Sequence, residues 1–227
     1  MSKAPIIVII ALAILFMVGL YLLSEMTGGT TFEERYSSID RLTFSVGKGS
    51  ILKQDLRVVL SYGNKSVEVQ KANRTIIVDS FSWPNYSICP VSKEQASEQK
   101  ECYNTPFTLI AIPKELLGVD SMEVPFPLAK NSKIIVNYVG VTSVDTPWGP
   151  HSVVNYTNMS VGFPQPNVNT TTFMYFDSLE GYVVEIDVSV TDGNLTSTAV
   201  YRLVEPPRLE GPLQIEKPEK WELSGGS

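Results

Sequence analysis

Side chains able to carry out chemistry are few in this chain. It has a single histidine, His151, in the segment "DTPWGPHSV", and no serine lies within a G-x-S-x-G pattern. Because a Ser-His-Asp hydrolase needs a histidine beside its nucleophile, we interpret His151 as a loop residue and not as a catalytic base. No glycine-rich segment of the G-x-x-x-x-G-K or G-x-G-x-x-G type is present to hold a phosphate.

Carboxylates are the next candidates, since glycosidases use two of them and calcium sites use several. Glu185 and Asp187 share one face of a predicted strand, but that is the face we expect to be solvated. Loop oxygens could hold calcium around Asp177 or Asp192, although no D-x-D-x-D-G run is present. Zinc or copper needs three or four ligands, which a single histidine and two cysteines do not supply.

A haem held by His151 and a methionine is left open, without an attachment motif. We therefore predict no catalytic residue, no metal site and no cofactor, and we expect a protein that is not an enzyme. The formal net charge of −6 and the pI near 4.9 argue against nucleic acid, which requires basic patches to neutralise phosphates.

Acceptors for asparagine-linked sugar are the most frequent motif. The segment "NYTNMS" holds two Asn-x-Ser/Thr triplets end to end, and seven of the eleven asparagines head such a triplet, where chance predicts about two. Turns rich in Asn, Ser and Thr are the alternative explanation. The predicted glycosylation sites are Asn64, Asn73, Asn85, Asn155, Asn158, Asn169 and Asn194.

The two cysteines, Cys89 and Cys102, flank a polar segment in "SICPVSKEQASEQKECY". A disulfide between them would close a loop of about 14 residues and stabilise the fold by roughly 3 kcal/mol in the chain-entropy model. Disulfides persist in oxidising compartments, which agrees with a sugar-modified surface. Two free thiols are the alternative.

A charge-free apolar segment near the N-terminus, "PIIVIIALAILFMVGLYLL", spans residues 5–23. At 1.5 Å per residue a helix of this length covers most of a bilayer core, which predicts a transmembrane helix in contact with membrane lipid. Lys3 precedes it and acidic residues follow it, so the N-terminus is expected in the cytoplasm and the rest outside the cell. A cleaved secretory signal is the alternative, although no small-x-small cleavage site follows.

The remaining chain predicts a mainly β protein. Short apolar runs alternate with Gly- and Pro-containing gaps, and only "PKELLG" at 113–118 indicates a helical turn. We expect an antiparallel immunoglobulin-like β-sandwich. The predicted organisation is a cytoplasmic N-terminus at 1–4, a transmembrane helix at 5–23, a tether at 24–40, a sandwich at 41–204 and a Pro-rich tail at 205–227. The tail lies extended on the domain, reaches for a partner or is disordered.

The clearest local pattern is a hairpin in "YVVEIDVSVTDGNLTSTAVYRLV", Tyr182 to Val204. Asp192-Gly193 predicts a two-residue turn, which pairs Val190 with Leu195. One face of the hairpin is then nearly all apolar and the other nearly all polar, as a hairpin buried on one side requires.

This hairpin resembles the closing strand pair of immunoglobulin-like and PKD-like extracellular domains, and the resemblance implies adhesion, spacing or assembly. We therefore expect an N-glycosylated, membrane-anchored surface protein of archaeal type, with a protein partner in the cell envelope or in a membrane complex. Two other classes are archaeal pilins and an archaellum stator subunit. Lys3-Ala4 resembles the pilin processing site, while Pro5 departs from the pilin pattern. An accessory subunit of a respiratory complex is a further alternative.

Overall fold

The computed structural model describes residues 31–91, 101–125, 133–159, 168–219 and 221, and the statements below refer to these. They form two antiparallel sheets and three short helical elements. The strands are β1 (Arg41–Phe44), β2 (Ile51–Tyr62), β3 (Lys65–Ser82), β4 (Asn85–Val91), β5 (Tyr103–Pro106), β6 (Ser121–Pro125), β7 (Lys133–Thr146), β8 (Gly149–Met159), β9 (Val168–Asp177), β10 (Val183–Asp192), β11 (Leu195–Leu203) and β12 (Leu213–Glu216). The helical elements are α2 (Phe32–Ser37), η1 (Phe107–Leu109) and η2 (Lys114–Leu116).

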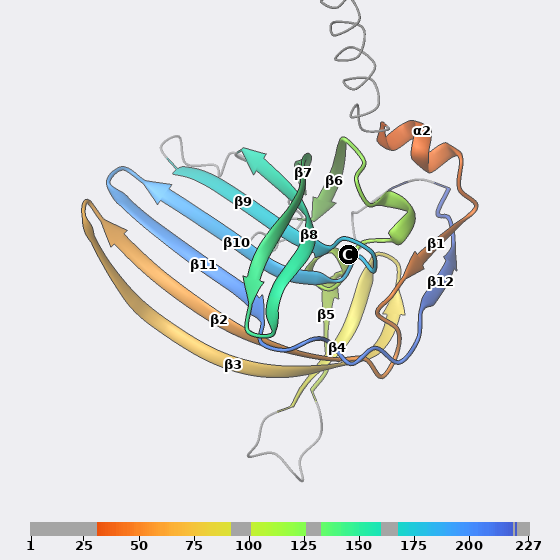
Figure 1. The fold of residues 1–227 in the computed structure, drawn as a ribbon, viewed down its shortest axis with the longest axis horizontal. Coiled ribbons are helices and arrows are strands. Elements are labelled where there is room, and N and C mark those ends of the chain that lie inside the picture. The colour runs from red at the N-terminus through yellow and green to blue at the C-terminus, as the bar shows by residue number, and fades with distance from the viewer. Residues whose placement is uncertain (1–30, 92–100, 126–132, 160–167, 220, 222–227) are drawn as a thin grey trace, which may run out of the picture.

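Ten of the strands make one strongly curved sheet in the order β5-β4-β3-β2-β11-β10-β9-β8-β7-β6 (Figure 1). Every neighbouring pair except one is consecutive in the sequence, so the sheet consists of two meanders, β2 to β5 and β6 to β11. The exception is the antiparallel pair of β2 with β11, which joins the two meanders edge to edge over Leu195↔Tyr62 to Leu203↔Gln54.

The predicted immunoglobulin-like sandwich is therefore wrong, although the mainly β composition is confirmed. A sandwich packs two sheets face to face, whereas here the core of a single curved sheet is covered by chain segment 107–120, which contains η1 and η2. Apolar alternation predicts strands but not their order in space, and the pairing of β2 with β11 is decided by residues about 140 positions apart.

The predicted transmembrane helix is also corrected, together with the single-pass membrane location that depended on it. None of the helices in the described part of the chain has the length and apolar character needed to cross a bilayer. Segment 5–23 itself lies outside the described residues.

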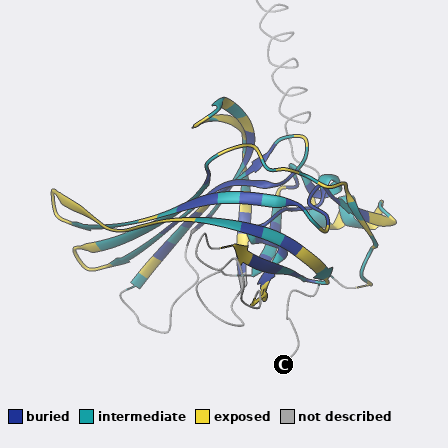
Figure 2. Ribbon diagram, turned by 90° about the horizontal axis from the view of Figure 1, so that it is seen from below, coloured by how far each residue is buried: buried dark blue, intermediate teal, exposed yellow. Residues whose placement is uncertain are grey.

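The inner face of the large sheet, defined here as the face that segment 107–120 covers, holds the core. Tyr156 on β8 accepts a hydrogen bond from the Gly118 amide at 2.8 Å and donates to the Leu116 carbonyl, which fixes η2 on the sheet. Burial raises the pKa of Tyr156, because ionisation would place a charge in this apolar site. Figure 2 shows that burial is concentrated here, while the far hairpin tips are exposed.

The apolar run at 107–112 forms the 3₁₀ helix η1 followed by an isolated bridge, and not a strand. A short apolar run is compatible with either form, because burial on all sides removes the alternation that marks a half-buried strand. Its backbone is tied to the β9–β10 turn, since the Ile112 amide donates to the Gly181 carbonyl at 2.8 Å. Gly181 is required there: its φ is +73°, and a Cβ would lie 2.6 Å from the Ile112 carbonyl oxygen.

The two described ends of the chain meet beside this core. β1 pairs with β12, and Phe32 of α2 lies 5.0 Å from the ring of Trp221 between centroids. Trp221 also contacts Trp83 and Phe107, and its indole N–H donates to the Glu123 carbonyl. Part of the predicted tether is thus helical, and the tail lies on the domain through residue 219.

The predicted β10–β11 hairpin is present with a different register. Its turn residues are Gly193 and Asn194, so Asp192 pairs with Leu195, where the prediction paired Val190 with Leu195. The shift is two residues along one strand, and side chains alternate with a period of two. The predicted apolar and polar faces therefore survive the error in register.

Candidate functional site

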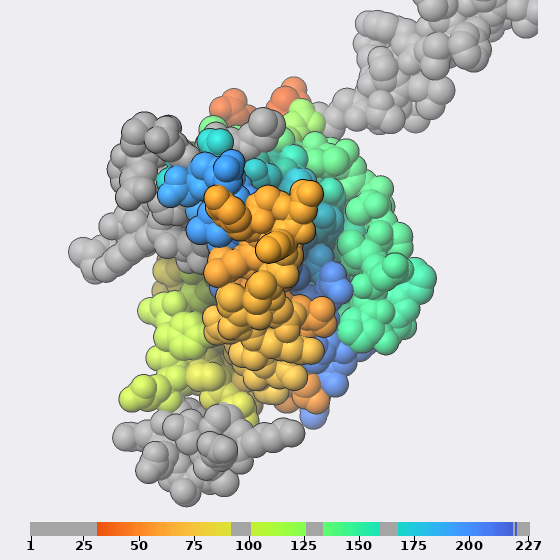
Figure 3. Space-filling model, turned by 90° about the vertical axis from the view of Figure 1, so that its left-hand side faces the viewer, coloured from red at the N-terminus to blue at the C-terminus, as the bar shows by residue number. Residues whose placement is uncertain are grey.

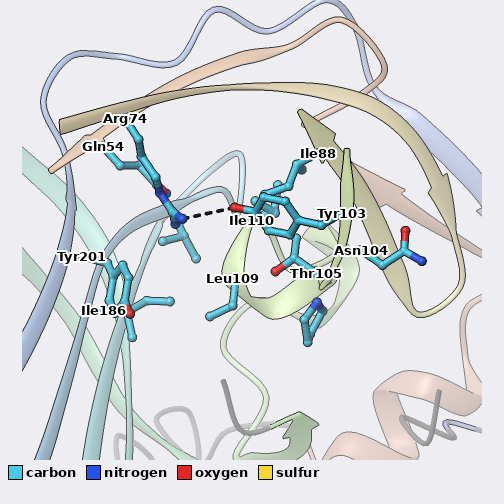
Figure 4. Close-up of a pocket in the computed structure, with 12 residues that line it drawn as sticks. Gln54, Arg74, Ile88, Tyr103, Asn104, Thr105, Leu109, Ile110, Ile186 and Tyr201 are labelled. Carbon is cyan, nitrogen blue, oxygen red and sulfur yellow. Dashed lines mark hydrogen bonds between the residues drawn. The ribbon is translucent and has the colours of Figure 1, made fainter. Parts of the chain in front are cut away.

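A pocket of about 280 Å³ lies between the inner face of the sheet and segment 103–110 (Figure 4). Strands β2, β3, β4, β10 and β11 provide one side, and β5 with η1 provides the other. The described lining residues are Gln54, Arg74, Ile88, Tyr103, Asn104, Thr105, Pro106, Leu109, Ile110, Val183, Ile186 and Tyr201.

Most of the pocket wall is apolar. Ile110 and Ile186 are almost completely buried, while Leu109 and Tyr201 are half-buried and pack against the core. These side chains come from η1 and from two strands of the other meander, β10 and β11, so the wall exists only because both meanders share one sheet. Such a wall favours an apolar ligand, since burying apolar surface is the main source of affinity.

Hydrogen bonds join three polar residues of the pocket, Gln54, Arg74 and Tyr103, while Asn104 and Thr105 also line it. The Nε and Nη2 of Arg74 both donate to Oε1 of Gln54, at 3.1 and 2.9 Å, and its Nη1 donates to the Tyr103 hydroxyl at 3.2 Å. The guanidinium carbon lies 5.8 Å from the centroid of the Tyr201 ring. Figure 4 shows Arg74 reaching toward Tyr103 across the pocket.

Local pairing explains this arrangement. Gln54 and Arg74 are directly opposite each other on β2 and β3, so their side chains leave the sheet on the same face. Tyr103 pairs with Ile88 of β4, and the next residues along these strands, Cys102 and Cys89, form a disulfide. The disulfide therefore holds β5, with Tyr103, against β4.

Arg74 has no ion pair with any residue that the structure describes, in contrast to arginines on the outer face of the sheet. There Arg202 contacts the carboxylate of Glu185, and Arg57 lies 3.3 Å from that of Asp55. Glu185, which was predicted to lie on a solvated face, is only 6% exposed. Its burial is compatible with a charge because Arg202 compensates it.

Asp187 lies next to this ion pair on the outer face and is less well compensated. Its Oδ1 is buried without a hydrogen-bond partner. Burial first, and then the charge of Glu185, raise the pKa of Asp187 to about 6, while Arg202 acts in the opposite direction. Both effects disfavour the charged form of the carboxylate.

The single histidine bridges two elements and lies outside the pocket. His151 on β8 contacts Asp177 at 2.8 Å between Nε2 and Oδ2 and lies 3.4 Å from the Tyr182 hydroxyl. The other oxygen of Asp177 accepts the amides of Leu179 and Glu180 in the β9–β10 turn. All of these contacts hold the turn against β8, which is a structural role.

The predicted disulfide and sugar acceptors are distributed as follows. Cys89 and Cys102 are bonded to each other, as predicted. Asn158 is 6% exposed, which disfavours a glycan in the folded protein, and Asn85 and Asn155 are half-buried. Occupancy of every acceptor stays a prediction. The exposed acceptors are Asn64, Asn73, Asn169 and Asn194.

Three of the exposed acceptors lie at one end of the sheet. Asn64 and Asn194 are in the tips of the β2–β3 and β10–β11 hairpins, which are neighbours through Leu195↔Tyr62. Figure 3 shows these tips side by side, β2–β3 in orange and β10–β11 in blue. Asn169 on β9 is opposite Thr191 on β10, close to the tip of the β10–β11 hairpin. This end is distinct from the pocket.

Sequence reasoning missed Arg74 and Gln54, although a signal was present. Arg74 has the parity of Ile76 and Val78 on β3, and Gln54 has that of Leu52 on β2, and these apolar residues are buried in the core. Polar residues at inward-facing positions of two strands indicate either a structural pair or a binding site. Gln54 and Arg74 are brought together only by the pairing of β2 with β3.

Comparisons with known proteins identify no relative by sequence: no family model matches the chain, and no curated protein does. One similar solved structure is a predicted lipoprotein from Parabacteroides distasonis, with a TM-score of 0.35 and 11% identity, covering 72% of this chain and 98% of that chain. A predicted exported protein with a YmcC-like fold from Bacteroides fragilis has a TM-score of 0.29 and 12% identity, covering 72% and 98%.

A LolA superfamily protein from Nitrosomonas europaea has a TM-score of 0.22 and 8% identity, covering 72% of this chain and 86% of that chain. None of the three is a pilin-like or PKD-like protein. TM-scores of this size do not indicate a shared function.

Proposed function

We propose that this protein binds a small, mainly apolar molecule in the inner-face pocket, and that it acts as a binding protein and not as an enzyme. The observation that carries the proposal is the pocket of about 280 Å³, whose wall is mostly apolar and which holds a few polar groups, among them the hydrogen-bonded cluster around Arg74. Ligand sites in proteins have this composition, with apolar walls and a few convergent polar groups.

The size of the pocket limits the ligand. Pockets for drug-sized ligands range from about 300 to 1,000 Å³, so a pocket of about 280 Å³ suits one small molecule or one short chain. Entry of an apolar ligand would remove its surface and that of the half-buried Leu109 and Tyr201 from water, which contributes about 25 cal/mol per Å² of apolar area.

Two features support binding over catalysis. The described lining contains no carboxylate, imidazole or thiol that could transfer a proton or attack a substrate. The His151–Asp177 contact lies on β8 and the β9–β10 turn, away from these residues. The Cys89–Cys102 disulfide additionally supports a compartment in which disulfides persist.

Equilibrium dialysis of the full chain against radiolabelled 1-octanol tests the proposal. We expect saturable binding of one molecule per chain, and a loss of affinity of at least about tenfold in Leu109→Trp, because the larger ring occupies the pocket. Leu179→Trp is the matched control, since Leu179 is 78% exposed in the β9–β10 turn. Absence of saturable binding, or equal binding by the two variants, would contradict the proposal.

A further inference from the structure

We infer that the ligand of this pocket carries a carboxylate, bound by Arg74 with Gln54 and Tyr103 as further donors, on a short apolar body. The inference rests on the proposed function and names the chemical class of its ligand. It depends on three features of the polar end of the pocket: the donors that are left free, the missing counter-charge, and the position of these groups beside the apolar wall.

The free donors follow from the hydrogen bonds within the cluster. A guanidinium has five N–H donors, and three of them are used on Gln54 and Tyr103, which leaves two. An arginine can only donate, so the Gln54 carbonyl oxygen must face it, and the orientation of the amide follows. The Tyr103 hydroxyl accepts from Arg74, so its own proton remains available.

Gln54 is the more informative of the two partners. Its side chain is almost completely buried, at 4% exposure for the residue, yet its amide nitrogen donates to no residue that the structure describes. This nitrogen is not among the fully buried, unpartnered atoms of the described residues, so it is an accessible donor that a ligand could use. Together with Arg74 and Tyr103, it makes a set of donors without an acceptor on the protein side, which is the complement of an anionic oxygen group.

The missing counter-charge points the same way. Arg74 is half-buried, and partial removal of a guanidinium from water is unfavourable unless an anion or acceptors replace the water. Elsewhere the chain supplies carboxylates to its cations, as in the Lys53–Glu205, Lys114–Glu180 and Arg202–Glu185 pairs. In the pocket the described residues supply only neutral oxygens to Arg74, so an anionic ligand would provide the compensating charge.

The apolar wall determines what must be attached to that anion. Tyr201, whose ring lies under the guanidinium, is on the same face of the hairpin as Ile186, and the two are directly paired. Leu109 and Ile110 face them from η1. A ligand with its carboxylate at Arg74 therefore extends its body along apolar side chains, which describes a short amphiphilic acid.

The test compares octanoate with 1-octanol, which differ at the polar end of the same eight-carbon chain. Equilibrium dialysis is performed on the full chain as wild type, Arg74→Met, Arg74→Lys and Lys71→Met. We expect wild type to bind octanoate more tightly than 1-octanol. Arg74→Met should lower the octanoate affinity by about 10- to 100-fold, because charge-assisted hydrogen bonds are lost, and should lower the 1-octanol affinity by a smaller factor, because the alcohol carries no charge.

The other two variants are the controls. Arg74→Lys keeps the charge without the planar fork and should give an intermediate octanoate affinity. Lys71→Met removes the same charge from an exposed position three residues away on the opposite face of β3, and should have no effect. Because all variants are dialysed under identical conditions, any binding of the probes outside the pocket is the same in each and cancels in the comparison.

The outcomes separate the two proposals. If 1-octanol binds saturably but wild type and Arg74→Met bind octanoate equally, the carboxylate inference is wrong and the proposed function stands. If Lys71→Met lowers octanoate binding as much as Arg74→Met, the effect is one of net charge, and the inference is again wrong. If neither probe binds wild type, both proposals fail.

Discussion

On the outer face of the ten-stranded sheet Arg202 lies against the carboxylate of Glu185, whereas on the inner face Arg74 meets, among the described residues, the neutral oxygens of Gln54 and Tyr103. The two arginines are on strands β11 and β3, which are separated by a single strand. The outer-face arginine is partly exposed and compensates the charge of the buried Glu185, and so contributes to the folded state. The inner-face arginine leaves its charge open toward a pocket, which is the pattern expected of a binding group.

The strongest expected effect concerns the covalent link beside the inner-face cluster. Replacing Cys89 and Cys102 together by alanine should lower the free energy of unfolding by about 3 kcal/mol, because the disulfide closes a loop of about 14 residues. Urea denaturation monitored by circular dichroism measures the change. Since β5 carries Tyr103, the same variant should also weaken octanoate binding more than 1-octanol binding. An unchanged urea midpoint would show that the link does not hold this part of the sheet.

The direct comparison of the two faces is a pair of Arg→Met variants. Arg202→Met leaves Glu185 buried without its partner, and we expect a loss of about 2 kcal/mol, less than for a fully buried pair because Arg202 is partly exposed. Arg74→Met leaves no unpaired charge on the protein and should cost about 1 kcal/mol or less. Thermal and urea unfolding of the two variants measure both values. A larger loss for Arg74→Met would reverse the assignment of structural and binding roles.

The smallest expected effect is a pH dependence on the outer face. The pKa of Asp187 is raised to about 6 in the folded protein from its ordinary value of 3.8, so between these values the folded state binds more protons than the unfolded state. Stability from this group is therefore fully present below about pH 4 and is lost as the pH rises through about 6. Asp187→Asn should remove the loss and raise the free energy of unfolding at pH 7 by about 1 kcal/mol, after allowance for solvent screening.

Urea midpoints of wild type and Asp187→Asn at pH 4 and pH 7 measure this effect. The difference between the two proteins should be larger at pH 7 than at pH 4. A difference of equal size at both values would mean that the substitution acts through packing and not through the charge of Asp187.

Local features of the fold were predictable from the sequence because they depend on neighbouring residues. The hairpin at 182–204 shows this most clearly, since alternation assigned its faces correctly even though the turn was placed one residue too early. The helical turn at 113–118 is present as η2 and ends before Gly118, whose φ is +78°. Pairing of Cys89 with Cys102 was the only intramolecular disulfide available to two cysteines.

The sequence by itself therefore determined the strand-rich composition, the buried face of the last hairpin and the disulfide. The tertiary structure alone decided that β2 pairs with β11, that 107–109 forms the 3₁₀ helix η1, and that no carboxylate of the described residues pairs with Arg74. The physical reason is range: alternation and turn chemistry act over a few residues. The pocket instead results from contacts among strands that are up to about 150 residues apart, and no local pattern encodes which of them become neighbours.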